Sequence, residues 1–216
     1  MGNGLNCSTP QGGAPKVEQV EQVQCSTTTP ILRGGGGGAR RQWPDSGVEQ
    51  IAGVRALGVD IGRKGGIAYL VGSDLIAALD MPTLPDGPAS RPSISAPLLA
   101  DIIRQLAPEI AYVEWVGPRP TDGAKAAFAF GAAKATVEAV LLVLGVPVQF
   151  ITPQVWKRLH GIPPGRDQKD IARATAVRRW PGSSALFARA GDDGRAEAAL
   201  IAVAGLMRDE ARKAAA

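Results

Sequence analysis

The sequence predicts an α/β domain in which a mixed β-sheet, three antiparallel strands followed by parallel ones, is covered by helices. Three short apolar runs, at 56–59, 66–71 and 74–80, are separated only by glycine-containing turns, a spacing that is typical of an antiparallel meander. Two later apolar runs, at 110–113 and 147–151, alternate with helical segments, and strands joined through helices pair in parallel. Together these patterns predict a single mixed sheet.

Helices account for most of the remaining sequence. One is expected to begin after Ser95, a good N-cap residue, and to carry Pro97 in its first turn before it ends near Leu106. The other helical segments expected are the long alanine-rich stretch 124–144, the short stretch 153–159, and 168–180 and 194–208. The proline-rich stretch 82–97 is expected to be mostly loop.

The folded domain is expected to span 54–210, between two segments that carry no sustained helical or strand period. Residues 1–53 are rich in Gly, Ser, Thr, Gln and Pro, a composition typical of disorder, and 211–216 is expected to be a second disordered tail. Cys7 and Cys25 are the only cysteines, so the domain has neither a disulfide framework nor a Cys–zinc site. Without a long uncharged apolar run or a secretory signal, we expect a cytoplasmic protein with no membrane partner.

Acidic residues stand where two predicted strands stop and where the last helix begins. Asp60 ends the first strand and Glu114 the fourth, and the last helix opens with a segment that contains Asp192, Asp193 and Glu197. Asp193 and Glu197 are four residues apart and therefore share one helix face. Taken alone, Asp60 is equally well explained as a turn cap, and the helix acids as residues that cap the helix and compensate its dipole.

Taken together, these acids favour a metal site. Strands one and four of a mixed sheet can be neighbours, which would bring Asp60 and Glu114 to one edge. Two unit charges about 4 Å apart repel by roughly 4 kcal/mol at an effective dielectric constant near 20, so clustered carboxylates oppose folding unless cations neutralise them. Oxygen ligands without a Cys or His cluster suit Mg²⁺ or Mn²⁺. The single histidine, His160, is expected to lie on the surface rather than to act as a base.

Four segments, in this order, resemble RuvC-type Holliday junction resolvases of the ribonuclease H-like fold, especially their phage and prophage relatives. The matching segments are Leu57–Gly62 for the first-strand motif, Tyr112–Gly117 for the second acidic motif, Ile151–Lys157 with Gly161 and Lys169 for the basic region, and Asp192–Leu200 for the C-terminal acidic helix. The resemblance implies a Mg²⁺- or Mn²⁺-dependent endonuclease that cuts four-way DNA junctions. It also implies a homodimer whose two sites cut opposed strands.

By this resemblance, Asp60, Glu114 and the acids of the last helix would hold the metal ions. The bacterial family commonly spaces its last two acidic positions three residues apart, whereas Asp193 and Glu197 are four apart. This departure leaves open whether Asp192 or Asp193 is the ligand. Glu197 also stands where many relatives have Asp, and its reach is longer by one carbon.

Basic residues supply candidate contacts to a DNA backbone, and the net charge of +4 permits a nucleic-acid partner without requiring one. The candidates are Arg63 and Lys64 beside Asp60, and Lys157, Arg158, Lys169 and Arg173 in the stretch before the last helix. Lys157 and Lys169 match the basic region of the family, while Arg63 and Lys64 could equally form a solvated turn. Phosphate contacts supply affinity and orientation rather than sequence choice.

Two other functions stay open on the residues alone. A kinase-like or actin-like ATPase also carries Asp-x-Gly after a strand, but no second glycine-rich phosphate motif occurs here. A catalytically inactive junction-binding protein would keep the fold, although the acids at all three locations speak against it. The long helix at 124–144 could be core, a dimer contact or both.

Overall fold

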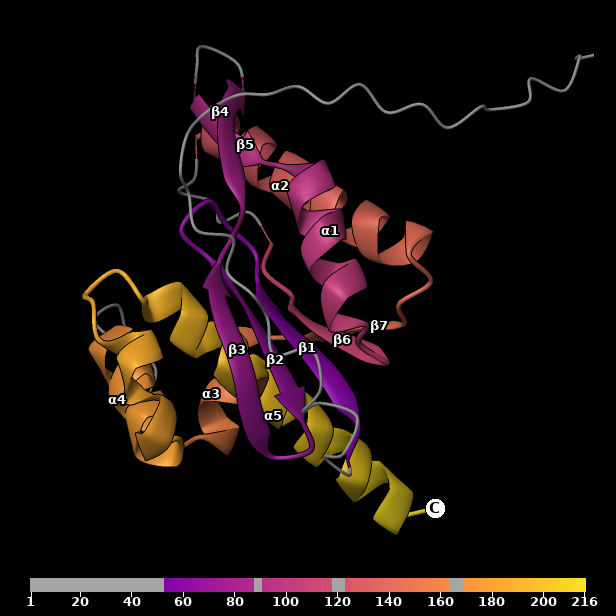
Figure 1. The fold of residues 1–216 in the computed structure, drawn as a ribbon, viewed down its shortest axis with the longest axis vertical. Coiled ribbons are helices and arrows are strands. Elements are labelled where there is room, and N and C mark those ends of the chain that lie inside the picture. Colours follow the sequence, from indigo (N-terminus) through magenta and orange to yellow (C-terminus); the bar gives the residue numbers. More distant parts are fainter. Residues whose placement is uncertain (1–52, 88–90, 118–122, 164–168) are drawn as a thin grey trace, which may run out of the picture. The chain divides into compact units, whose positions relative to one another are not determined.

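The computed structural model describes residues 53–87, 91–117, 123–163 and 169–216 (Figure 1). Except for its last residue, the segment 1–53, which was expected to be disordered, lies outside the described residues. The elements are β1 (Arg55–Asp60), β2 (Gly66–Val71), β3 (Asp74–Asp80), β4 (Thr83–Gly87), β5 (Arg91–Ile94), α1 (Ala96–Leu106), β6 (Ile110–Glu114), α2 (Ala124–Val143), β7 (Val148–Ile151), α3 (Pro153–Leu159), α4 (Lys169–Arg179), the 3-10 helix η3 (Pro181–Phe187) and α5 (Asp193–Ala214).

The main sheet has five strands in the order β3-β2-β1-β6-β7, which confirms the predicted mixed sheet. The first three strands form the expected antiparallel meander, and β6 and β7 join β1 in parallel. Val59 is paired with Val113 in the β1–β6 ladder, so the next residue of each strand, Asp60 and Glu114, ends its strand at the same level. Two separated acids are thereby brought to one edge of the sheet.

Helices cover both faces of the sheet, as side chains alternate along each strand. On one face, Leu57, Val59 and Val113 pack in a core with α1 and α2. On the other face, Ala56 and Tyr112 pack in a core with α3, α4 and α5 (Figure 1). By this alternation Asp60 and Glu114 belong to the second face, the one that α5 covers.

Small residues allow α5 to lie directly on the strands. A Cβ added to Gly58 of β1 would stand 2.0 Å from the carbonyl oxygen of Ala198, and one added to Gly205 of α5 would stand 2.1 Å from the Tyr112 ring. Ala198, Ala202 and Gly205 are fully or almost fully buried in this contact. Close packing along its length therefore holds α5 at a fixed position over β1 and β6.

Three segments differ from the expectations. The stretch 82–97, expected to be mostly loop, contains the antiparallel pair β4–β5, whose prolines are tolerated because both strands of a two-stranded ribbon are edges. The 3-10 helix at Pro181–Phe187 was not expected. Helix α5 continues to Ala214, so most of the presumed tail 211–216 is helical, in keeping with the strong helix propensity of its Ala, Arg and Lys residues.

Helix α2 is not simply a core helix. Val137, Val140 and Leu141 are buried, but the side chains of Phe128 and Leu142 are 77% and 70% exposed. Within the part of the chain that the structure describes, α2 is also the one helix long and apolar enough to cross a membrane by length and composition alone, a test that core helices of soluble proteins also pass. An apolar surface is therefore left uncovered on α2.

Candidate metal and nucleic-acid site

The carboxyl ends of β1 and β6 carry the first two candidate ligands. Asp60 is half-buried, whereas Glu114 is only 8% exposed. An Oε1 atom of Glu114 accepts a hydrogen bond of 2.8 Å from the indole Nε1 of Trp156, which lies on α3 and is fully buried. A buried carboxylate needs such a donor, because its desolvation is otherwise costly.

The start of α5 is brought to the same end of the sheet by glycines. Gly65, in the turn after β1, forms an isolated parallel bridge with Gly194 of α5. Gly66 is the ladder partner of Asp60, and a Cβ on Gly66 would lie 2.6 Å from the carbonyl carbon of Gly194. Because no side chains separate these backbones, the segment that contains Asp193 and Glu197 lies at the end of β1.

The structure therefore places Asp60, Glu114, Asp193 and Glu197 around one end of the sheet, from three elements. Within the described residues, however, no group of three or more His, Cys, Asp or Glu side chains is gathered closely enough to hold an ion. The donors are all carboxylates, a set that fits a hard divalent cation, and the backbone places them within one region. The fold thus brings the four carboxylate-bearing residues to one region, and a bound cation would have to draw their side chains closer together.

Asp192 is held by arginines. Its carboxylate, only 1% exposed, accepts hydrogen bonds from the backbone N–H, Nε and Nη2 of Arg189 at 2.7, 2.8 and 2.6 Å. Burial alone would raise the pKa of Asp192, but the hydrogen bonds from Arg189, together with the charges of Arg195 and Arg189, lower the pKa overall. Asp192 is therefore part of an ion-pair network at the beginning of α5.

An ion-pair network around Asp192 fixes the beginning of α5. Arg195 of α5 donates from Nε and Nη2 to the two oxygens of Asp80 at the end of β3, at 2.6 and 2.7 Å. Arg189 also donates to Asp80, at 3.1 Å. The hydrogen bond from Arg195 is the main reason that the pKa of Asp80 is lowered. These bidentate contacts orient the helix turn that carries Asp193 and Glu197.

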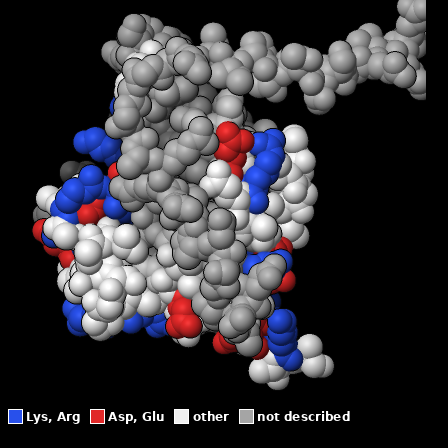
Figure 2. Space-filling view, in the orientation of Figure 1, with Lys and Arg blue, Asp and Glu red and all other residues white. Residues whose placement is uncertain are grey.

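The candidate DNA-binding residues fall into different environments. Arg63 and Lys64 are exposed in the turn that follows Asp60. Arg173 is already engaged, since it pairs with Asp170 at 3.0 Å and donates to the carbonyl oxygen of Arg189. The side chain of Lys169 lies outside the described part of the structure. Among the described residues on the face seen in Figure 2, basic and acidic side chains lie intermixed.

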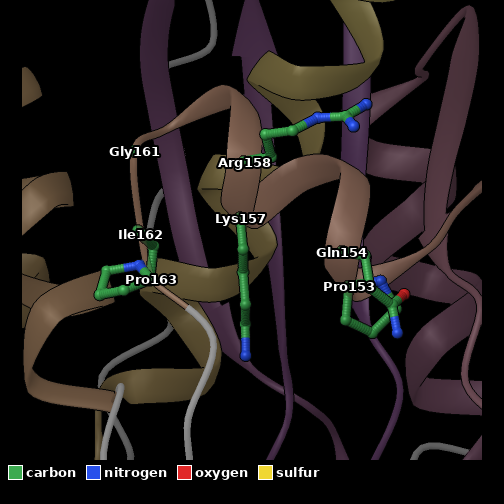
Figure 3. Close-up of a pocket in the computed structure, with 7 residues that line it drawn as sticks. All are labelled: Pro153, Gln154, Lys157, Arg158, Gly161, Ile162 and Pro163. Carbon is green, nitrogen blue, oxygen red and sulfur yellow. The ribbon is translucent and has the colours of Figure 1, made fainter.

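Lys157 and Arg158 line an open pocket of about 580 Å³ on α3 and the turn that follows it. The other lining residues are Pro153, Gln154, Gly161, Ile162 and Pro163 (Figure 3). In Figure 3, the side chains of Lys157 and Arg158 leave α3 in different directions, and Lys157 extends between the prolines that line the pocket.

His160 is half-buried, so the expectation of a surface histidine was wrong. Its Nε2 lies 2.8 Å from the carbonyl oxygen of Leu200 on α5. Burial lowers the pKa of His160 below 6.5, against the opposing effect of this hydrogen bond, and the charge of Arg179 lowers the pKa further. His160 thus connects the end of α3 to the middle of α5 in its neutral form.

The neutral state of His160 makes stability depend on pH. The pKa of His160 is lower in the folded state than in the unfolded state. The stability that neutral His160 contributes is therefore complete above about pH 6.5 and is lost as the pH falls toward the folded pKa. The free energy of unfolding, measured by urea denaturation from pH 7.5 to 5, should decrease by at most about 1.4 kcal/mol per pH unit. His160→Gln should remove most of this slope. An unchanged slope in the variant would show that other groups cause it.

Sequence reasoning overlooked Trp156 and the pair Asp80–Arg195. Trp156 lies within the segment that resembles the basic region, but its contact with Glu114 depends on the approach of α3 to the end of β6. Asp80 ends an apolar strand, as Asp60 does, and this was the one signal that could have drawn attention to it.

No protein-family model matches the sequence, and no curated protein matches it. The fold is similar to that of Thermus thermophilus RuvC bound to a Holliday junction substrate, with a TM-score of 0.53, 18% identity, and coverage of 73% of this chain and 95% of that one. A second T. thermophilus RuvC structure gives a TM-score of 0.50, 18% identity, and coverage of 72% and 97%. For the yeast mitochondrial Holliday junction resolvase Ydc2, the TM-score is 0.42 and the identity 16%, and the match covers 76% of this chain and 82% of that one. The likeness shows a ribonuclease H-like fold, as in RuvC.

Proposed function

We propose that this chain is a divalent-cation-dependent endonuclease that cuts four-way DNA junctions. The observation that carries the proposal is the placement of four carboxylates, from β1, β6 and α5, at one end of a ribonuclease H-like sheet. The similarity to a RuvC structure bound to a Holliday junction supports branched DNA as the substrate. The activity belongs to DNA recombination or to the processing of phage DNA.

In the proposed cleavage reaction, Mg²⁺ or Mn²⁺ would be held by the four carboxylates, those of Asp60, Glu114, Asp193 and Glu197. When bound, such cations activate water and stabilise the charge that develops on the phosphate during phosphodiester hydrolysis. Arg63 and Lys64, exposed beside Asp60, would contact the phosphates flanking the scissile bond, and Lys157 would hold the backbone farther along. The network of Asp80, Arg195, Arg189 and Asp192 keeps the first turn of α5 in place.

The test is cleavage of a labelled four-way junction by the full chain in millimolar Mg²⁺, with a linear duplex of the same sequence as the control. We expect paired, symmetrically placed nicks in the junction and no cuts in the duplex. Binding without cleavage would instead indicate an inactive junction-binding protein. Turnover of ATP without DNA cleavage would indicate the kinase-like or actin-like alternative.

Two opposed nicks require two sites, and the exposed apolar face of α2 supports a homodimer that would supply them. Phe128, Leu142 and Val143 are 77%, 70% and 85% exposed. A second copy of the same helix would cover this face in a two-fold symmetric contact, in which both partners use the same surface. Burial of such side chains favours association.

Phe128→Lys should therefore convert a dimer into a monomer, because it places a charge in the apolar contact. Light scattering after size-exclusion chromatography measures the mass directly. Leu98→Lys is the matched control, since Leu98 is a 44% exposed apolar residue on α1 and should not affect the mass. A wild-type monomer, or a dimer unaffected by Phe128→Lys, would rule out this interface.

A further inference from the structure

Trp156 is the buried residue that joins α3 to the candidate metal site. Its indole is fully buried in the core that α5 covers, and its Nε1–H points to Oε1 of Glu114 at 2.8 Å. The accepting carboxylate is itself only 8% exposed. Since neither group can exchange this partner for bulk water, the hydrogen bond fixes one oxygen of Glu114.

The backbone around this contact is also well defined. Glu114 is the ladder partner of Ile151 at the end of β7, and the N–H of Trp115 donates to the Ile151 carbonyl at 2.8 Å. Helix α3 begins two residues after Ile151, so a short connection sets the position of Trp156 relative to Glu114. The Trp156 ring is held by core packing, and Glu114 is held by the hydrogen-bond ladder of β6. Neither partner of the Trp156–Glu114 hydrogen bond therefore has much freedom to move.

Trp156 also stands beside the residue that faces the α3 pocket. Nζ of Lys157 is 5.2 Å from the centroid of the Trp156 ring, and Lys157 lines the pocket shown in Figure 3. One short helix therefore carries both a candidate phosphate contact and the donor to a candidate metal ligand. No such role was expected for Trp156 from the sequence.

We infer that Trp156 is a positioning residue, which orients the Glu114 carboxylate for a divalent cation through its indole N–H. The inference rests on the proposed function, because it takes Glu114 as a metal ligand. Partners that hydrogen-bond to a ligand orient it, and their loss commonly weakens metal affinity by about 10–100-fold. Trp156→Phe retains an aromatic ring in the core and removes the N–H.

The chain offers a matched control in Trp180. This residue is also largely buried, and its Nε1 donates to the carbonyl oxygen of Ser73 at 3.0 Å, a backbone acceptor rather than a carboxylate. Trp180→Phe thus removes an indole hydrogen bond of similar length, with the same change in side-chain volume. Any difference between the two variants reports on Glu114 rather than on the loss of an indole.

The experiment is a calorimetric titration of the full chain with Mn²⁺, without DNA, for wild type and both variants. We expect the Mn²⁺ dissociation constant to rise by about 10–100-fold in Trp156→Phe and to stay at the wild-type value in Trp180→Phe. A wild-type constant in Trp156→Phe, or an equal loss in both variants, would overturn the inference.

A second measurement avoids the possibility that Trp156→Phe does not fold. Replacement of Trp43, Trp115 and Trp180 by Phe leaves Trp156 as the only tryptophan. Addition of Mg²⁺ should then produce a saturable change in its fluorescence, whereas a constant emission would contradict the inference.

If wild type binds Mn²⁺ but does not cut junctions, the proposed function fails alone. If it cuts junctions and Trp156→Phe binds Mn²⁺ normally, the inference fails alone.

Discussion

Asp60→Asn is expected to abolish junction cleavage and to leave junction binding intact. Asp60 ends β1 at the centre of the candidate site, beside Glu114 and the start of α5. The substitution keeps the size of the side chain but removes the charge that a cation requires. A catalytic cation contributes several kcal/mol to the transition state, and each 1.36 kcal/mol is tenfold in rate, so the loss should be on the order of 10³-fold or more.

The cleavage rate is measured on a labelled junction in Mg²⁺, and binding by mobility shift in Ca²⁺. Asp74→Asn serves as the control, because Asp74 is exposed at the start of β3, and its partner Val71 pairs with Arg55 at the opposite end of the meander. Asp74→Asn should cleave at the wild-type rate. If Asp60→Asn also lost binding, Asp60 would have a structural role rather than one in metal binding.

Gly194→Ala is expected to reduce both stability and cleavage, although alanine is the better helix former. A Cβ at this position would stand 2.4 Å from the carbonyl oxygen of Lys64 and 2.6 Å from the carbonyl carbon of Gly65. Relief of this clash requires α5 to move away from the turn after β1, because the opposing atoms belong to the backbone. Overpacking costs up to about 3 kcal/mol, and the rigid backbone on the other side of this contact favours the upper end, whereas the gain in helix propensity is only about 1 kcal/mol.

Chemical denaturation gives the change in the free energy of unfolding, and the junction assay gives the change in rate. Gly191→Ala is the control in the same segment, since an added Cβ there would meet no atom within 4 Å. It should be neutral in both assays. A Gly194→Ala protein of wild-type stability and activity would show that close contact between α5 and the turn is not needed to position Asp193 and Glu197.

Much of the fold follows from local patterns in the sequence. The glycine turns between the first three apolar runs predict the meander, and the apolar run before each strand-end acid predicts the edge at which Asp60 and Glu114 meet. The pair β4–β5 was not predicted, because prolines usually argue against strands and only the two-stranded pairing makes them acceptable.

The details of the site depend on contacts between distant segments. Asp192 and Asp193 are indistinguishable by type, and only the position of Arg189 shows that the first is held in ion pairs. The role of Trp156 depends on the distance between α3 and β6, and that of Asp80 on the distance between β3 and α5. A sequence pattern predicts which face of a strand or helix a residue occupies, but not which hydrogen-bond donor from a distant segment contacts it on that face.

The most direct measurement is a crystal structure of the full chain grown with Mn²⁺, with the ion located by its anomalous scattering. We expect an anomalous peak at the carboxyl end of β1, with oxygens of Asp60 and Glu114 and at least one of Asp193 and Glu197 as ligands. A crystal in which Mn²⁺ occupies other positions only, while those carboxylates bind no ion, would contradict a metal site shared by β1, β6 and α5.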